Sequence, residues 1–391
     1  MEVRQTPRDR KLGDNFTMSP TTTDSVSIAG SLSRAASDRV GHGALFVYTL
    51  AIIYASLNPF FGWRAPESFG LFTWPRYLNG FDILLNVLAY LPLGGMLAAM
   101  QMRSPRRPER TLYPLRVMAR TVLAGFALST GMESLQTMLP GRVSSPIDLL
   151  ANTAGTLIGA SVLLNRWGRT LLALVFRWRR RYFMRGDVCG WGLLLLGAWF
   201  FAQLNPVIPF FEAGHIANPF DTAASQTAYD PLILLPQSVG ITLNVCGFSL
   251  FLSLLLRPGR RVILNVLLIL ALGFFTKVST ASLMLKAPQM VGWLGPATII
   301  GLTAGLLLFA WFSRVGYRWR AFCASLFIFA GGLMAKMASV YGAFDETLRL
   351  LNWPHGHLIS FASLTRWVHE TWPLLAFLLV AWIFVKYRES R

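Results

Sequence analysis

Charged residues are scarce in this chain. Asp, Glu, Lys and Arg make up 14% of the 391 residues, while 54% are apolar and the mean hydropathy is +0.48. A soluble domain carries about 25% charged residues. The chain therefore has too few charges to cover a water-facing surface, which excludes an ordinary soluble domain and indicates that lipid is its main solvent.

Acidic residues and cysteines are especially few. The chain has 18 Asp and Glu against 36 Lys and Arg, a formal net charge of +18. The basic clusters stand beside long apolar runs, which is typical of membrane topology and not of nucleic-acid binding. Three cysteines, Cys189, Cys246 and Cys323, lie in or beside apolar runs without metal-ligand spacing. We expect them to be buried small side chains, and we expect neither a cofactor nor a metal.

Long apolar runs predict an all-α fold, a polytopic transmembrane helical bundle of about ten spans. A helix needs about 20 mostly apolar residues to cross the hydrocarbon core. The candidate spans are residues 43–58, 81–102, 117–139, 147–165, 188–205, 238–256, 262–284, 292–312, 321–342 and 372–387. The apolar segment 169–176 is too short to cross and is flanked by arginines, so we expect it to lie in the membrane interface.

Basic and non-basic loops alternate along the chain. Lys and Arg cluster in both tails and in loops 103–116, 166–185, 257–261 and 314–320, whereas residues 206–235 contain none. Basic loops remain on the cytoplasmic side. An even number of spans places every basic loop there, so we expect both termini in the cytoplasm. The first apolar run does not end in a cleavage site, which argues against a cleavable signal peptide.

Repeated tripeptides predict a parallel internal repeat, a 4+4+2 arrangement of spans. Three tripeptides recur in the same order at corresponding spans: Leu-Asn-Pro at 57–59 and 204–206, Leu-Asn-Val at 85–87 and 243–245, and Thr-Ala-Gly at 153–155 and 303–305. Chance similarity among apolar helices is the alternative. The predicted units are a disordered cytoplasmic tail (1–42), a four-helix unit (43–165), a basic linker with the interfacial segment (166–187), a degenerate second four-helix unit (188–313) and a C-terminal helix pair (314–391).

Polar side chains gather in the first four-helix unit. Charged groups inside spans are costly and usually functional. Those of spans 2, 3 and 4 stand three or four residues apart within each span, so each set shares one helix face. In chain order the candidate ligand-binding residues are Asp82, Asn86, Glu133, Gln136, Arg142, Asp148 and Asn152.

The predicted topology brings these seven residues to one depth, in the outer third of the membrane. There they would form an exoplasm-facing polar pocket with an excess of carboxylates. Two structural alternatives stay open. Asp82 and Asp148 stand in the first turns of their helices, where an acid favours the helix dipole. Glu133, Gln136 and Arg142 can tie neighbouring helices together by hydrogen bonds.

The order of these motifs resembles the VanZ-like family. The resemblance covers roughly residues 45–165 and includes the paired Asp-x3-Asn motifs at Asp82 and Asp148, Glu133-x2-Gln136 and Arg142. It implies a cell-envelope protein of the bacterial inner membrane with a role of the teicoplanin-resistance type, but it supplies no reaction. The glycines at 155 and 159 also indicate close helix packing.

The second unit lacks most of this pattern. Ala281 and Met284 stand at the positions that match Glu133 and Gln136. Of the candidate site residues, only Asn86 keeps its residue type in the second unit, as Asn244. We therefore expect the second unit to be a scaffold. Lys277 and Lys336 lie in the outer thirds of their spans. They could be counter-charges to the carboxylates, but the favoured interpretation is that their side chains snorkel outward.

The predicted outer loop 343–371 is rich in aromatic and imidazole side chains. Trp353, Trp367 and Trp372 favour an aromatic interface segment over a metal site for the histidines of this loop. The chain has no P-loop, GxSxG, HExxH or dinucleotide-binding motif. Membrane lipids are the partners that the composition implies.

Three functions remain open. The leading hypothesis is a membrane protein whose outward-facing pocket binds a polar head group, such as that of a lipid-linked or glycopeptide-like ligand. The second is an enzyme acting on a lipid-linked envelope substrate with Glu133 as acid or base, although no nucleophile accompanies it. The third is a small-solute transporter. The ligand and the oligomeric state do not follow from the sequence.

Overall fold

The fold is seen in a computed structural model, which describes residues 22–58, 60–65, 80–103, 113–140, 142–206, 208, 210–211, 231–259, 261–284, 294–339 and 355–389. Within these residues the chain forms eleven helices: α1 (Thr22–Leu57), α2 (Gly80–Arg103), α3 (Tyr113–Gln136), α4 (Pro146–Leu164), α5 (Arg166–Tyr182), α6 (Asp187–Gln203), α8 (Pro231–Leu255), α9 (Val262–Met284), α10 (Pro296–Phe312), α11 (Tyr317–Ser339) and α13 (His355–Glu389). The predicted all-α fold is confirmed.

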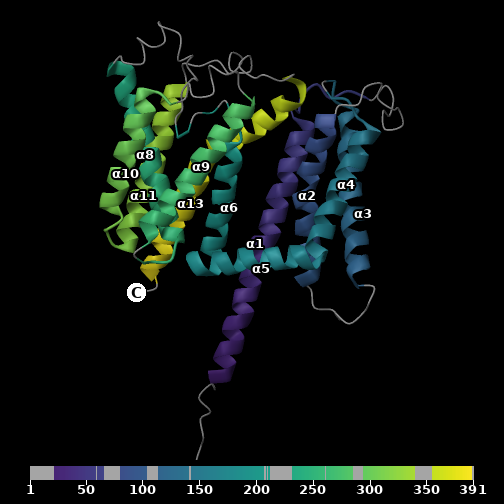
Figure 1. Cartoon of the computed structure of the whole chain (residues 1–391), viewed down its shortest axis with the longest axis horizontal. Coiled ribbons are helices and arrows are strands. Elements are labelled where there is room, and N and C mark those ends of the chain that lie inside the picture. The colour runs from purple at the N-terminus through teal and green to yellow at the C-terminus, as the bar shows by residue number, and fades with distance from the viewer. Residues whose placement is uncertain are drawn as a thin grey trace, which may run out of the picture.

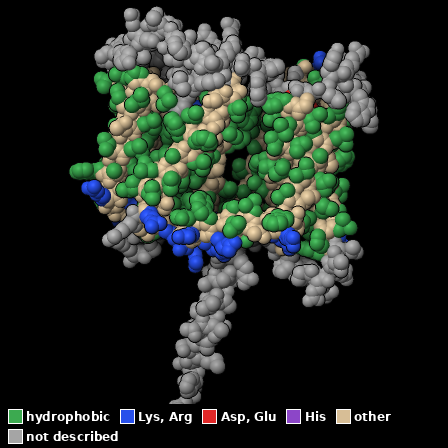
Figure 2. All heavy atoms as spheres, in the orientation of Figure 1, with side chains coloured by type: hydrophobic (Ala, Val, Ile, Leu, Met, Phe, Trp, Pro, Cys, Tyr) green, Lys and Arg blue, Asp and Glu red, His purple; other side chains and the backbone are tan. Residues whose placement is uncertain are grey.

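Each of the ten predicted spans corresponds to a helix, and these helices run side by side (Figure 1). In the described part of the chain, 6 helices are long and apolar enough to cross a membrane, and α6 and α10 are shorter apolar helices. The more polar α3 and α11 lie among them (Figure 1). Hydrophobic side chains cover the flank of the bundle (Figure 2). Many large apolar side chains are exposed; Leu123 and Phe275, for example, are 66% and 68% exposed. Such a surface is suited to lipid and not to water.

Helix α5 lies across one end of the bundle, nearly perpendicular to the other helices (Figure 1). We call this end the α5 end and the opposite end the loop end. Arginines form a band along the α5 end (Figure 2). The start of α1 and the end of α13 lie at the same end, as an even number of spans requires. The predicted interfacial segment 169–176 is thus the middle of a longer helix.

Both ends of α5 are fixed to the rest of the chain. At its start, Asn165 caps the helix, and Gly168 packs against the carbonyl group of Val162. At its end, Phe183 forms an isolated antiparallel bridge with Leu256, which follows α8. The side chain of Arg257 also donates to the carbonyl oxygen of Phe183, at 3.1 Å. Helix α5 therefore connects the first four helices to the C-terminal half as a fixed strut.

Two helix boundaries differ from the sequence prediction. Helix α1 begins at Thr22, inside the predicted disordered tail 1–42, because an apolar helix, once nucleated, extends at low cost through residues such as Ala and Leu. Helix α13 begins at His355, within the predicted outer loop 343–371, and contains Pro373. Neighbouring helices allow a membrane helix to continue through proline.

In the first four helices, glycines let α2 and α4 approach closely, and α2 packs most extensively on α4. A methyl group at Gly155 would lie 2.4 Å from the carbonyl oxygen of Val87, and one at Gly159 would lie 1.9 Å from that of Leu91. A methyl group at Gly94 would lie 2.1 Å from the carbonyl oxygen of Thr156. The predicted close-packing role of Gly155 and Gly159 is confirmed.

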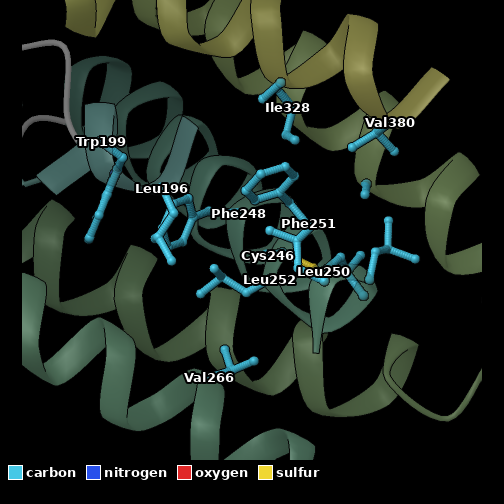
Figure 3. Close-up of a cluster of buried hydrophobic side chains, with 14 of the residues drawn as sticks. Leu196, Trp199, Cys246, Phe248, Leu250, Phe251, Leu252, Val266, Ile328 and Val380 are labelled. Carbon is cyan, nitrogen blue, oxygen red and sulfur yellow. The ribbon is translucent and has the colours of Figure 1, made fainter. Parts of the chain in front are cut away.

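The C-terminal half has a large apolar core around α8 (Figure 3). Phe248 and Phe251 of α8 are fully buried, and Trp199 of α6 packs on Phe248 with ring centroids 4.2 Å apart. Helices α10 and α11 both pack extensively on α8. All three cysteines are free; Cys189 and Cys246 are buried, as the sequence predicts, whereas Cys323 is only partly buried. An aromatic core thus stabilises this half, whereas close glycine contacts stabilise the first.

One pair of equivalent contacts supports the predicted internal repeat. Gly155 of α4 packs on Val87 of α2, and Gly305 of α10 packs on Val245 of α8, the residues that the repeated tripeptides align. The two halves differ elsewhere, because α3 packs on α4 whereas α9 contacts α6 and α8. The duplication itself remains a prediction.

Candidate functional site

The loop ends of α2 and α4 are joined by a pair of polar side chains. The amide nitrogen Nδ2 of Asn86 donates to Oδ1 of Asp148 at 2.7 Å. Ser145 caps α4 by accepting from the backbone N–H of Ile147, so Asp148 stands in the first turn, as the capping alternative predicts. Asp148 therefore both favours the helix dipole and binds a second helix, so the two interpretations of this residue are compatible.

Glu133 is buried against the N-terminus of α4. Its side chain is 3% exposed, and its carboxylate oxygen Oε2 accepts from the backbone N–H of Ser145 at 2.9 Å. Asp148 lies within electrostatic range, and Ser144 lies close by. Glu133 and Asp148 thus both lie at the N-terminal turn of α4. Two carboxyl groups meet at this helix terminus, where backbone N–H groups favour negative charge.

Asn152 lies one turn further into the bundle than Asp148. It is 5% exposed, and its Nδ2 donates to the hydroxyl oxygen of Ser129 at 2.9 Å. Asp82 stands in the first turn of α2, four residues before Asn86 and on the same helix face. Five predicted residues, Asp82, Asn86, Glu133, Asp148 and Asn152, therefore lie toward the loop end on α2, α3 and α4.

Gln136 and Arg142 both donate to carbonyl oxygens at the end of α1. Gln136 Nε2 donates to the carbonyl oxygen of Ser56 at 3.0 Å. The guanidinium of Arg142 donates to the carbonyl oxygens of Ala55 at 2.7 Å and Asn58 at 3.0 Å. Burial lowers the pKa of this guanidinium from its ordinary value, but arginine remains protonated in proteins. For these two residues the structure has the contacts that the helix-tying alternative predicts.

The snorkelling interpretation of Lys277, on α9 in the second half, is wrong. Its side chain is fully buried, and its ammonium group donates to the carbonyl oxygens of Asn205 and Ile208, just beyond α6. Because the described contacts of this ammonium group are to carbonyl oxygens, they do not support the alternative that Lys277 is a counter-charge to the carboxylates of the first unit. The ammonium bends inward because the carbonyl groups at the end of α6 need donors that lipid does not supply.

Asn205 and Thr365 are polar residues that the sequence analysis missed. Asn205 Nδ2 donates to Thr365 Oγ1 at 3.0 Å and so ties the end of α6 to α13. Asn205 is the counterpart of Asn58 in the repeated Leu-Asn-Pro tripeptide, whose carbonyl oxygen binds Arg142. The repeat could have indicated that each asparagine carbonyl would receive a cationic donor.

Other predicted features are only partly visible. The side chains of Lys336, His355 and His357 lie outside the described residues. Trp367 is described, and its ring stacks on Tyr54 of α1 with centroids 6.2 Å apart. Within the described part of the chain, no group of three or more His, Cys, Asp or Glu side chains could hold a metal ion.

In the described part of the chain, ten helices run side by side, their flank is suited to lipid, and a polar cluster lies at one end. These features define a polytopic helical membrane protein. Residues 26–169, which include α2, α3 and α4, match the family model described as VanZ/LLP1. The N-terminal part of the chain is therefore VanZ-like, as its motifs indicated. No curated protein and no solved structure matches the chain.

Proposed function

We propose that the loop end of the VanZ-like unit binds the polar head group of a cell-envelope ligand, either lipid-linked or glycopeptide-like. The observation that carries this proposal is the buried Glu133, which lies beside Asp148 at the N-terminus of α4. A buried carboxyl group in a membrane helix is costly, and such groups usually have a function.

The side chains at this site favour a ligand that supplies hydrogen-bond donors. Asp82, Glu133 and Asp148 contribute carboxyl groups, which accept hydrogen bonds when ionised. Arg142 donates to α1 and so positions that helix. Ammonium groups and sugar hydroxyls, both common in envelope precursors, are the complementary chemistry. We infer a location in a bacterial inner membrane, with the loop end facing the exoplasm.

The first test is resistance to teicoplanin in a susceptible host. Expression of the protein should raise the minimal inhibitory concentration several-fold, and Glu133→Ala and Asp148→Ala should each abolish the increase. Glu370→Ala is the matched control, because Glu370 is exposed on α13 and pairs only with Arg366 of its own helix among the described contacts. No increase by the wild type, or an increase that Glu133→Ala retains, contradicts the proposed role.

The second test is native mass spectrometry of the detergent-extracted protein. A co-purified envelope lipid should be present in the wild type and in Glu370→Ala, and lost in Glu133→Ala. Membrane levels and melting temperature must be equal in the three proteins. Loss of ligand together with loss of folded protein supports the helix-tying role of Glu133 instead.

A further inference from the structure

The buried face of α3 carries polar side chains from Thr121 to Glu133. Thr121, Ser129 and Glu133 are buried at intervals of four or eight residues, and Gly125 stands between Thr121 and Ser129. Thr121 and Ser129 are 0% exposed and Glu133 is 3% exposed. Glu133 lies twelve positions after Thr121, which corresponds to about 18 Å of helix, more than half of the hydrocarbon core of about 30 Å.

Helix α4 supplies the polar group that α3 lacks at Gly125. The hydroxyl oxygen of Thr156 would lie 2.4 Å from a methyl group at Gly125, so Thr156 fills the space above this glycine. Thr156 Oγ1 in turn donates to the carbonyl oxygen of Asn152 at 3.0 Å, and Asn152 donates to Ser129. Each turn of α3 between Thr121 and Glu133 therefore has a buried hydroxyl or carboxyl group beside it.

This series of polar groups extends to the α5 end. Gln101, near the end of α2, donates from Nε2 to Thr121 Oγ1 at 2.9 Å. Tyr113, the first residue of α3, donates from its hydroxyl to the carbonyl oxygen of Gln101 at 2.9 Å. Toward the loop end, the hydroxyl of Tyr90 lies beside Ser129 and near Glu133. We call the set Gln101, Thr121, Thr156, Asn152, Ser129, Tyr90 and Glu133 the polar column.

Two buried atoms of the polar column, Asn152 Oδ1 and Gln101 Oε1, have no hydrogen-bond partner among the described residues. Tyr90 and Asn152 are 2% and 5% exposed. Buried polar atoms without a partner are rare, and water molecules with two to four polar neighbours usually satisfy them. Residues that served only to tie helices together would use these atoms in direct contacts.

We propose that the polar column is a hydrated proton pathway that connects the α5 end of the VanZ-like unit to Glu133. Water molecules and the hydroxyl groups of Thr121, Thr156, Ser129 and Tyr90 pass the proton, each oxygen accepting one proton and releasing another. The last transfer converts the Glu133 carboxylate into the carboxylic acid. Gln101 and Asn152 orient the water molecules. This role goes beyond ligand binding and does not depend on it.

Water in the column is tested by X-ray hydroxyl-radical labelling of the full-length protein in lipid nanodiscs. Tyr90 should be oxidised in spite of its burial, while Phe248, 0% exposed in the apolar core, should not. Thr121→Val, which removes a hydroxyl group at almost constant volume, should lower the labelling of Tyr90 several-fold. Thr130→Val is the control, because among the described residues the Thr130 hydroxyl donates to the Phe126 carbonyl oxygen of its own helix.

Each result decides between the alternatives. An unlabelled Tyr90 in the wild type means a dry interface and overturns the proposal. Labelling that persists in Thr121→Val means that water does not enter from the α5 end, which also overturns it. Thr156→Val tests the next level of the column, in case Thr121→Val fails to fold, and should have the same effect.

Proton delivery is tested by infrared spectroscopy. The carbonyl band of protonated Glu133 is identified by its loss in Glu133→Gln. After transfer to D₂O, this band should shift several-fold more slowly in Thr121→Val than in the wild type or in Thr130→Val. An unchanged rate shows that Glu133 exchanges by another route and overturns the pathway, whether or not the unit binds an envelope ligand.

Discussion

At the scale of single residues, two cations bind backbone oxygens where a helix ends. Arg142 donates to Ala55 and Asn58 at the end of α1, and Lys277 donates to Asn205 and Ile208 beyond α6. The last carbonyl groups of a helix lack intrahelical donors, and lipid provides none. Each of these cationic side chains therefore supplies the hydrogen-bond donors that the carbonyl groups at the helix end lack.

Lys277→Met should destabilise the protein. It leaves the carbonyl oxygens of Asn205 and Ile208 without this donor, and each loss costs about 1–3 kcal/mol, partly offset by removal of a buried charge. We expect the free energy of unfolding to fall by about 2–4 kcal/mol, measured by unfolding in detergent. Thr276→Val, next to it on α9, should change little because its hydroxyl binds Leu272 of the same helix. Equal stability of Lys277→Met and the wild type contradicts this role.

Arg142→Ala should loosen the end of α1. Two hydrogen bonds from a charged group are lost, each worth about 1.5–3 kcal/mol, and the effect should appear as a lower melting temperature and faster proteolysis after Asn58. Arg169→Ala, which removes an exposed arginine of α5, is the control and should melt like the wild type. If ligand binding is lost in Arg142→Ala at unchanged stability, Arg142 is a ligand-binding residue instead.

At the scale of elements, the interface of α2 and α4 fixes the site. Asn86 and Asp148 can share a hydrogen bond only because Gly94, Gly155 and Gly159 let the two backbones come together. Small residues are the usual means of close packing between membrane helices, because van der Waals contact replaces the hydrophobic effect in lipid. The position of the carboxylates thus depends on glycines further along the same helices.

Gly159→Ala tests this dependence. Its methyl group would lie 1.9 Å from the carbonyl oxygen of Leu91, so α4 must move away from α2, at a cost of about 1–3 kcal/mol. Gly131→Ala on α3 is the matched control, because nothing lies within 4 Å of the added methyl group. It should be neutral or stabilise the helix by about 0.5–1 kcal/mol. Thermal unfolding in detergent compares the two variants, and similar melting temperatures would refute the close contact.

At the scale of the whole molecule, the two halves are packed differently but are joined by α5 at the same end of the bundle. The VanZ-like unit is held by glycine contacts and polar side chains, whereas the C-terminal half surrounds α8 with aromatic and aliphatic side chains. Helix α5 joins them at the end that carries the arginines (Figure 2). Because basic segments remain in the cytoplasm, we expect the α5 end to face it.

Reporter fusions test this orientation. Green fluorescent protein should fluoresce at both termini, and alkaline phosphatase should be inactive there because it needs an oxidising compartment. Alkaline phosphatase inserted between α6 and α8, in the segment without Lys or Arg, should be active. Reporters of opposite behaviour at the two termini would mean an odd number of spans.

The sequence alone determined the all-α fold, the ten helices that correspond to spans and the VanZ-like character of the first unit. These features follow from local properties. The length of an apolar run decides which segments enter lipid, and the motif residues are recognised by their order and spacing along the chain. The boundaries of α1 and α13 were less well predicted. How far a helix extends, and whether it continues through a proline such as Pro373, depends on more than local hydropathy.

Only the tertiary structure decided the partner of each polar group. Sequence spacing put Glu133, Gln136 and Arg142 on one side of the membrane, but it did not show that Glu133 contacts α4 while the other two contact α1. It also led to the wrong orientation for Lys277. The reason is physical: in lipid a buried polar group must find its partner on a neighbouring helix, and which neighbour is within reach depends on how closely the glycines allow the helices to pack.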